Sequence, residues 1–354
     1  MKTIPVILAG GEGSRFWPLS RKKSPKQILN LSGNDTLIAE AVKRFEVYGA
    51  NVHIVTAAEQ AKHIQGALPD NADIQYILEP VQRGTAACIL MAVFKIYKEY
   101  GECVICMSPS DHYITNNDEF TNVMDSAIEC AAGHDKIVTI GITPSFPATG
   151  YGYICCDYDL SYGKAYEVKE FVEKPSFNKA TGFLNSGNYF WNSGIFVFKA
   201  SVILESFKRF LPRIYNSLAE WDDFSGSTEQ TETLFNKIYG SLQNISIDYG
   251  IIERSSEVCV IPANMGWNDI GSWDSLGCLF PPDEFGNIVR AKTINLDTKN
   301  CVMYSDKSLV ATIGIENLII VDCDDALMIC DKSEAQRVKE LVGILKEKDL
   351  HEYL

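Results

Sequence analysis

The chain has 354 residues, 46% of them hydrophobic and 22% charged, so it is long enough to bury a large core. Its formal net charge of −14 argues against a nucleic acid or an anionic membrane as partner. No apolar run approaches a membrane span, and the eleven cysteines lack the paired spacings of a zinc site. These features predict a globular protein of the reducing cytoplasm.

The first predicted element is a strand over residues 4–8 that runs into a glycine-rich loop. A short apolar run that stops at glycines is typical of a buried parallel strand. Five cations follow closely, at Arg15, Arg21, Lys22, Lys23 and Lys26. Main-chain N–H groups ringed by cations form a phosphate cradle. We place this cradle at Ala9, Gly10, Gly11, Gly13 and Ser14.

Two other glycine motifs fit this loop poorly. A dinucleotide-binding fingerprint needs a third glycine where Phe16 stands. The P-loop spacing, which ends in Gly-Lys-Ser/Thr, is absent. Both motifs also require a helix to begin at once, and Trp17-Pro18 argues against one. A plain turn after a strand stays open as the alternative.

Apolar periodicity predicts alternating strands and helices along the first part of the chain. The predicted helices cover residues 36–48, 57–68, 86–100 and 120–132, and the predicted strands cover residues 51–56, 74–78, 104–107 and 137–142. This alternation is typical of an α/β fold with a parallel sheet. Ligands of such sheets bind beyond the carboxyl ends of the strands, so segments 10–26, 79–86 and 108–113 should gather along one edge.

The stretch LAGGEGSRFWPLSRKKSPKQIL closely resembles the signature of the sugar-1-phosphate nucleotidyltransferases, and within them the mannose-1-phosphate guanylyltransferases. The shared pattern is a Gly-Gly-x-Gly-x-Arg loop, then Trp-Pro-Leu-Ser, then Pro-Lys-Gln. The resemblance implies a Rossmann-like, mixed and mostly parallel sheet flanked by helices. It implies GTP and mannose 1-phosphate as substrates, GDP-mannose as product and Mg²⁺ as cofactor. It also makes Arg15 and Lys26 catalytic cations that hold phosphates.

The segment from Glu79 to Ala86 follows a predicted strand. By itself it is a loop leading to a helix, with Thr85 as N-cap. The family carries Glu-Pro-x-x-Arg-Asn-Thr-Ala-Pro-Ala at this place. The resemblance therefore assigns Glu79, Arg83 and Thr85 to the nucleotide, with the Glu79 carboxylate accepting from guanine. This chain departs from the family pattern at three positions, Gly84, Ala87 and Cys88.

Two aspartates far apart in the sequence are candidate magnesium ligands. Magnesium prefers oxygen ligands and is typically held by one or two carboxylates plus substrate phosphates. The resemblance matches Asp111 and Asp269 with the family's two metal-binding aspartates. By themselves, Asp111 fits a turn or helix cap and Asp269 fits an N-cap for a helix near Ser272. The neighbouring His112 is predicted to be structural, because an ionised sugar phosphate needs no base.

The sugar is expected to lie against a loop over residues 144–153, whose small and tyrosine residues suit its C–H and O–H surface. The resemblance makes Gly150 a sugar contact and assigns Glu173 to sugar hydroxyls, Lys174 to the sugar phosphate and Asn192 to the sugar. Adjacent residues of a strand point to opposite faces, so a salt bridge between Glu173 and Lys174 is not expected. A bend at Pro175 is the way for both to converge.

The remaining chain divides into a helical and a β-rich part. Residues 200–254 show helical spacing, with a polar connection over 222–230. Residues 287–330 contain short β-type pieces between turns, followed by a helix over 333–348, which predicts a β-helix-like appendage. We predict a nucleotidyltransferase catalytic domain over residues 1–282 and a C-terminal β-helix-like domain with a terminal helix over residues 283–354.

Some alternatives stay open at this point. The same reaction on another sugar 1-phosphate or another nucleotide is one, and a non-catalytic nucleotide-sugar sensor is the other. Some relatives continue into a sugar-phosphate isomerase domain. Since the chain stops at Leu354, that activity is expected to be absent. A homodimer is inferred by analogy alone.

Overall fold

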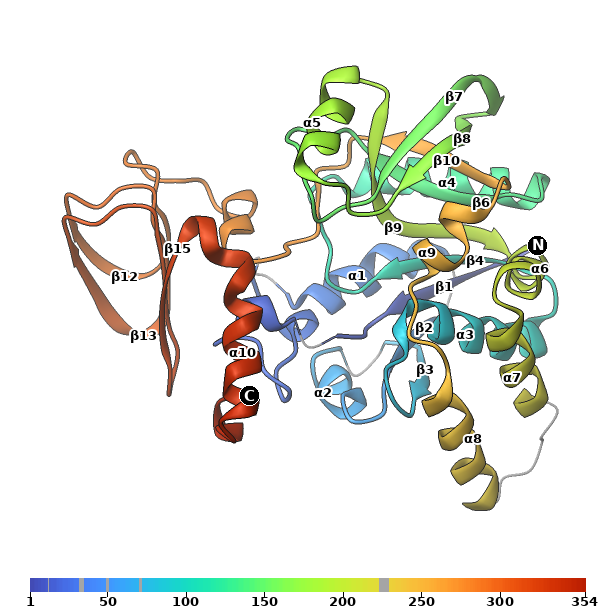
Figure 1. Ribbon diagram of the computed structural model, residues 1–354, viewed down its shortest axis with the longest axis horizontal. Helices are drawn as coiled ribbons and strands as arrows, with labels where there is room; N and C mark the ends of the chain where they lie inside the picture. Colours follow the sequence, from blue (N-terminus) through green and yellow to red (C-terminus); the bar gives the residue numbers. More distant parts are fainter. Residues whose placement is uncertain (12, 32–34, 49–50, 70–71, 223–228) are drawn as a thin grey trace.

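The computed structural model describes residues 1–11, 13–31, 35–48, 51–69, 72–222 and 229–354. Its larger part is a nine-stranded sheet with helices on both faces, and its smaller part is a four-stranded sheet with a C-terminal helix (Figure 1). The polar connection predicted over residues 222–230 lies mostly outside the described residues. None of the helices in the described ranges is long and apolar enough to cross a bilayer.

The large sheet has the strand order β3-β2-β1-β4-β9-β6-β10-β8-β7, and β9 also pairs with β7. Its strands are β1 (Lys2–Leu8), β2 (Val52–Ala57), β3 (Ile74–Glu79), β4 (Cys103–Pro109), β6 (Ile137–Ile142), β7 (Tyr153–Tyr162), β8 (Ala165–Val172), β9 (Tyr189–Lys199) and β10 (Val258–Ala263). The pairs among β1 to β4 and the pair β6–β10 are parallel, whereas β7, β8 and β9 pair antiparallel. The predicted α/β fold with a mixed sheet is confirmed.

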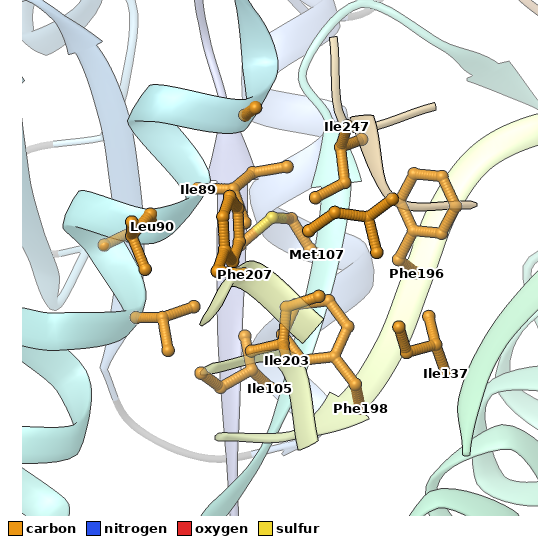
Figure 2. Close-up of a cluster of buried hydrophobic side chains, with 14 of the residues drawn as sticks. Ile89, Leu90, Ile105, Met107, Ile137, Phe196, Phe198, Ile203, Phe207 and Ile247 are labelled. Carbon is orange, nitrogen blue, oxygen red and sulfur yellow. The ribbon is translucent and has the colours of Figure 1, made fainter. Parts of the chain in front are cut away.

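The core lies in two layers, because neighbouring residues of a strand face opposite sides of the sheet. In β4, Ile105 and Met107 belong to one buried cluster, and Val104 and Cys106 to the other. The first face is covered by α3 (Gly84–Tyr100), α6 (Ala200–Phe210), α7 (Pro212–Asp222), α8 (Glu229–Ser241) and α9 (Ile247–Gly250). The second is covered by α1 (Leu37–Phe45), α2 (Ala61–Gly66), α4 (Asn117–Gly133) and α5 (Phe177–Ser186). Figure 2 shows part of the first cluster, in which Phe207 of α6 belongs to the same buried group as Ile105 and Met107 of β4.

Two helix starts test the sequence predictions. For α1 the sequence allows either Thr36 or Asp35 as the cap, and the structure selects Thr36, whose Oγ1 accepts from the N–H of Ala39 at 3.3 Å. The prediction of Thr85 as N-cap is wrong, because α3 begins at Gly84, two residues before the predicted start, and Arg83 is its N-cap residue. The helix predicted over residues 57–68 is shorter in the structure, where α2 covers only Ala61–Gly66 and Ala57 is the last residue of β2.

The C-terminal sheet consists of β12 (Ile288–Leu296), β13 (Val302–Ile313), β14 (Leu318–Asp322) and β15 (Leu327–Asp331). Its first three strands are parallel although only short turns join them, which is typical of a β-helix, and β15 returns antiparallel. The 3₁₀ turn η6 (Lys332–Arg337) then leads into α10 (Val338–Glu347). The predicted C-terminal β-rich appendage and its terminal helix are present.

This small part packs directly on the N-terminal loop of the large part. Val302 and Val338 share one buried cluster with Phe16 and Trp273. The indole Nε1 of Trp17 donates to the carbonyl of Tyr353 at 2.8 Å. The division into two domains at residue 282 stays a prediction. The cluster of Phe16, Trp273, Val302 and Val338 contains residues from both sides of that boundary.

Candidate active site

The loop after β1 folds back so that Lys26 lies against Gly13. Gly13 has a φ of 64°, and a Cβ there would lie 2.3 Å from the Cβ of Lys26, so only glycine fits. Gly10 and Gly11 face open space, which leaves their main chain accessible. The N–H of Ala9 instead donates to the carbonyl of Val55 at 2.8 Å, so it continues the sheet and is not free for a phosphate. A single 3₁₀ turn, η1 (Ser14–Phe16), follows the loop in place of a helix.

The five predicted cations have different surroundings. Arg15 and Lys26 line one cavity, described below. Arg21 donates from Nη1 to Oδ2 of Asp325 at 2.8 Å and thereby fastens the C-terminal sheet. Lys22 and Lys23 are exposed and line no part of that cavity. The cationic site is therefore smaller than the sequence suggests.

The ammonium of Lys26 joins both candidate metal-binding segments. Its Nζ donates to Oδ2 of Asp111 and to the carbonyl of Asp269, each at 2.7 Å. The Lys26 side chain is only 7% exposed, so this charge is held in place. Burial by itself raises the pKa of the Asp111 carboxyl, but the charge of Lys26 helps to outweigh it and lowers that pKa. Asp111 is therefore ionised at neutral pH.

A two-stranded ladder brings the two aspartates together. β5 (Tyr113–Ile114) directly follows the Asp111 turn and pairs antiparallel with β11 (Trp267–Asn268), which directly precedes Asp269. The hydroxyl of Tyr151 then donates to Oδ1 of Asp269 at 2.7 Å and orients that carboxylate. The alternative of Asp269 as an N-cap is wrong, because Ser272 caps the next turn.

His112 lies between these segments as a neutral side chain. Its Nδ1 accepts from the indole of Trp267 at 3.1 Å, and burial lowers its pKa to about 4. The imidazole is therefore uncharged at neutral pH and already hydrogen-bonded. Both facts support the structural role predicted for it.

Two adjoining cavities open beside these residues. The basic cavity, of about 300 Å³, is lined by Gly13, Ser14, Arg15, Lys26, Asp111, His112, Asp269, Gly271 and Lys339. The acidic cavity, of about 210 Å³, has among its lining residues Thr85, Gly150, Tyr151, Glu173, Lys174, Asn192, Asp248 and Asp269. Both include His112 and Asp269 in their walls. Residues from all three predicted loop segments therefore do gather at one edge of the sheet.

The acidic cavity is organised around Asn192. Its Oδ1 accepts from Oγ1 of Thr139 at 2.9 Å, and its Nδ2 donates to Oδ1 of Asp248 at 3.0 Å. Glu173 and Lys174 form an ion pair, so the expectation of no mutual salt bridge is wrong. β8 ends at Val172 and Lys174 has a φ of 47°, so the strand alternation no longer applies there.

Asp248 is the residue of this cavity that sequence reasoning missed. Burial, and secondly the nearby charge of Glu173, raises its pKa to about 6. Its only local signal is an acid in the first turn of a helix capped by Ser246, and that pattern is equally typical of a helix start. Its place in the cavity comes from packing between distant segments.

The predicted base-recognition segment is only partly at the site. Glu79 is 4% exposed, lines neither cavity, and accepts from the hydroxyl of Tyr239 at 2.6 Å. Arg83 also lines neither cavity, whereas Thr85 lines the acidic one and accepts from the N–H of Ile247 at 2.8 Å. Gly84 has a φ of 73°, and a Cβ there would lie 2.6 Å from the carbonyl oxygen of Ile245, which explains glycine at this departure from the family pattern.

Comparisons with known proteins agree with this architecture. A family model described as nucleotidyl transferase matches residues 4–281, and one described as a mannoseP isomerase/GMP-like beta-helix domain matches residues 291–345. The alginate biosynthesis protein AlgA of Pseudomonas fluorescens is 35% identical, over 98% of this chain and 72% of its own length. Mannose-1-phosphate guanylyltransferase 2 of Escherichia coli O157:H7 is 36% identical, over 99% of this chain and 75% of its own.

A solved structure is similar along nearly the entire chain. It is described as a mannose-1-phosphate geranyltransferase from Thermus thermophilus, with a TM-score of 0.88 and 32% identity. The similarity covers 98% of this chain and 100% of that one. The family resemblance and the fold class predicted from the sequence are confirmed.

Proposed function

We propose that this chain, which belongs to the nucleotidyl transferase family, transfers a guanylyl group from GTP to mannose 1-phosphate, forming GDP-mannose and pyrophosphate. The observation that carries this proposal is the pair of cavities that meet at Asp269. One is lined by cations and bare main chain, which suits a triphosphate. The other is lined by carboxylates and an amide, which suit sugar hydroxyls. The names of the relatives supply the choice of guanosine and mannose.

The chemistry needs charge control more than proton transfer. An oxygen of the sugar phosphate forms a bond to the α-phosphorus of GTP, and the bond from that phosphorus to the bridging oxygen of pyrophosphate breaks. Pyrophosphate leaves with the electron pair, so no side chain has to remove a proton. Two polyanions must meet in line, and catalysis is then mostly positioning and electrostatic stabilisation.

The residues of the basic cavity match this requirement. Gly10 and Gly11, in the loop that leads to Arg15, do not line the cavity but have open space beside them and offer their N–H groups to the phosphates; the half-buried Arg15 lines the cavity and has no ion pair within the described ranges. Arg15 neutralises pyrophosphate as it leaves. Lys26 is fixed between Asp111 and Asp269 and binds phosphate next to the transfer point.

The donor set of the two aspartates fits Mg²⁺. Each carboxylate has one oxygen engaged, by Lys26 or by Tyr151, and its second oxygen has no side-chain hydrogen bond from the described residues. Within the same residues no group of three or more metal-binding side chains is found, so phosphates and water must complete the coordination. When bound by Asp111 and Asp269, Mg²⁺ would supply positive charge to the phosphate oxygens.

In the acidic cavity the sugar is held by hydrogen bonds. Glu173 and Asp248 accept from sugar hydroxyls, Asn192 donates, and the Gly150 loop covers the ring. Lys174, which is 54% exposed, turns from Glu173 to the sugar phosphate. All eleven cysteines are free thiols, the state that the proposed cytoplasmic location maintains. A homodimer stays a proposal by analogy.

A substrate panel tests the proposal. Pyrophosphate release is measured with GTP, ATP, UTP, CTP and dTTP against mannose, glucose and heptose 1-phosphates, with Mg²⁺ and with EDTA. We expect the highest kcat/KM for GTP with mannose 1-phosphate. With EDTA we expect no pyrophosphate release. Preference for another pair would overturn the substrate assignment. If the folded protein released no pyrophosphate with any pair of substrates, the non-catalytic sensor would be favoured.

A further inference from the structure

We propose that Lys339, on the C-terminal helix α10, binds the phosphates of the nucleotide, a role that rests on the proposed function. Lys339 lines the basic cavity together with Arg15 and Asp269. The other residues of that wall lie between Gly13 and Gly271, in the large part of the molecule. The C-terminal part therefore completes the site as well as capping the fold.

Two sets of contacts fix α10 at the cavity. Val338, next to Lys339, is 1% exposed in the cluster that also contains Phe16 and Trp273, and Val342, one turn further along the helix, is 7% exposed. On one side, Nε2 of Gln336 donates to Oγ of Ser272 at 2.7 Å, close to Asp269. On the other side, the hydrogen bond from Trp17 to Tyr353 joins the chain end to the loop that carries Arg15. The base of the Lys339 side chain is therefore held between the two halves of the site.

The charge of Lys339 has no carboxylate partner among the residues that the structure describes. Within the described ranges its ammonium has no ion pair, whereas Arg337 on the preceding turn pairs with both Glu334 and Glu340. Lys26, in the same cavity, is engaged by Asp111. Lys339 and Arg15 are thus the cations of this wall without a carboxylate partner among the described residues, in a protein whose net charge is −14.

Helix stability does not account for this lysine. Lys339 is the second residue of α10, and a cation in the first turn of a helix is disfavoured by the helix dipole. Its side chain is exposed, so it covers no core. The ammonium of Lys339 lies at the cavity on a flexible side chain, which suits a contact with phosphate. Such a contact would explain why the helix carries a lysine at a position that slightly disfavours it.

The test compares Lys339→Met with Lys348→Met, which removes an exposed lysine at the other end of the same helix. We expect Lys339→Met to raise the KM for GTP by about five- to tenfold, the size of one partly screened charged hydrogen bond, with a Tm that is equal to or slightly above that of the wild type. Lys348→Met should match the wild type. Lys339→Arg should restore most of the lost affinity.

Equilibrium titration with inorganic tripolyphosphate, followed by tryptophan fluorescence, gives a second readout that needs no turnover. The affinity of Lys339→Met should fall by the same factor as its KM rises. Wild-type affinity in this variant, or an equal loss in Lys348→Met, would overturn the role of Lys339. A lower Tm with an unchanged tripolyphosphate affinity would make the residue structural. If the wild type turned over no substrate, the proposed reaction would fail, and this titration would still decide the phosphate contact.

Discussion

The two cavities that meet at Asp269 acquire their charge in different ways. The basic cavity takes Arg15 from the first loop and Lys339 from the last long helix, and neither cation has a carboxylate partner in the described ranges. The carboxylates Glu173 and Asp248 of the acidic cavity come from the middle of the chain, and the charge of Glu173 adds to burial in raising the pKa of Asp248. In the proposed function, the first cavity attracts polyanions through unpaired charge and the second orients a sugar through hydrogen bonds.

The largest effects are expected in the basic cavity. Arg15→Ala and Asp111→Asn should each lower kcat/KM for GTP by about a hundredfold to a thousandfold, because each removes a charge fixed before the reaction begins. Circular dichroism melts should show a folded protein in both cases. Wild-type rates in either folded variant would refute the role assigned to that residue.

A glycine pair tests whether the basic cavity depends on its loop geometry. Gly13→Ala places a Cβ against Lys26 at a φ of 64° and should lower the free energy of unfolding by roughly 2–3 kcal/mol, and activity with it. Gly10→Ala, at a position open to solvent, is the matched control and should fold like the wild type. Urea unfolding measures both. Equal stabilities would show that Lys26 can move away at little cost.

A third variant separates the acidic cavity from the basic one. Asp248→Asn should raise the KM for mannose 1-phosphate by about tenfold, because a charged acceptor becomes a neutral amide. The KM for GTP should change little. A reversed pattern, with GTP affected more than the sugar phosphate, would contradict the division between the cavities.

The same variant should be more stable than the wild type at neutral pH. The folded pKa of Asp248 is about 6, above the ordinary 3.8, so the stability linked to its protonated form is present below pH 4 and is lost as the pH rises through 6. Above pH 6, Asp248→Asn should gain roughly 1–3 kcal/mol in free energy of unfolding. Near pH 4 the two proteins should unfold alike. A constant difference across this range would place the pKa of Asp248 elsewhere.

The smallest effect is the pH dependence of sugar binding. As the pH falls below about 6, Asp248 takes up a proton and the wild-type KM for mannose 1-phosphate should rise severalfold. The substrate phosphate also titrates, so the ratio of wild type to Asp248→Asn is the quantity to measure. A ratio that does not change with pH would exclude Asp248 as the titrating group.

Much of the basic cavity was predictable from local sequence. The strand, the glycines and the nearby cations are contiguous, and the family signature covers Arg15 and Lys26 without a change. Asp111 and Asp269 were candidates because the family resemblance matches them with its two metal-binding aspartates. Their meeting was not predictable, since it depends on the pairing of β5 with β11 between distant segments. Predictions at Glu79 and Ala9 fit less well, because their polar groups are used inside the protein.

The sequence by itself determined the alternation of strands and helices, the glycine-rich and cationic character of the first loop and the β-rich C-terminal part. These features depend on apolar spacing and on glycine, which act over a few residues. Only the tertiary structure decided that Asp248 enters the acidic cavity with a raised pKa and that Lys339 reaches the basic one. Burial and charge pairing depend on side chains from far along the chain, and local pattern carries no information about which of them will meet.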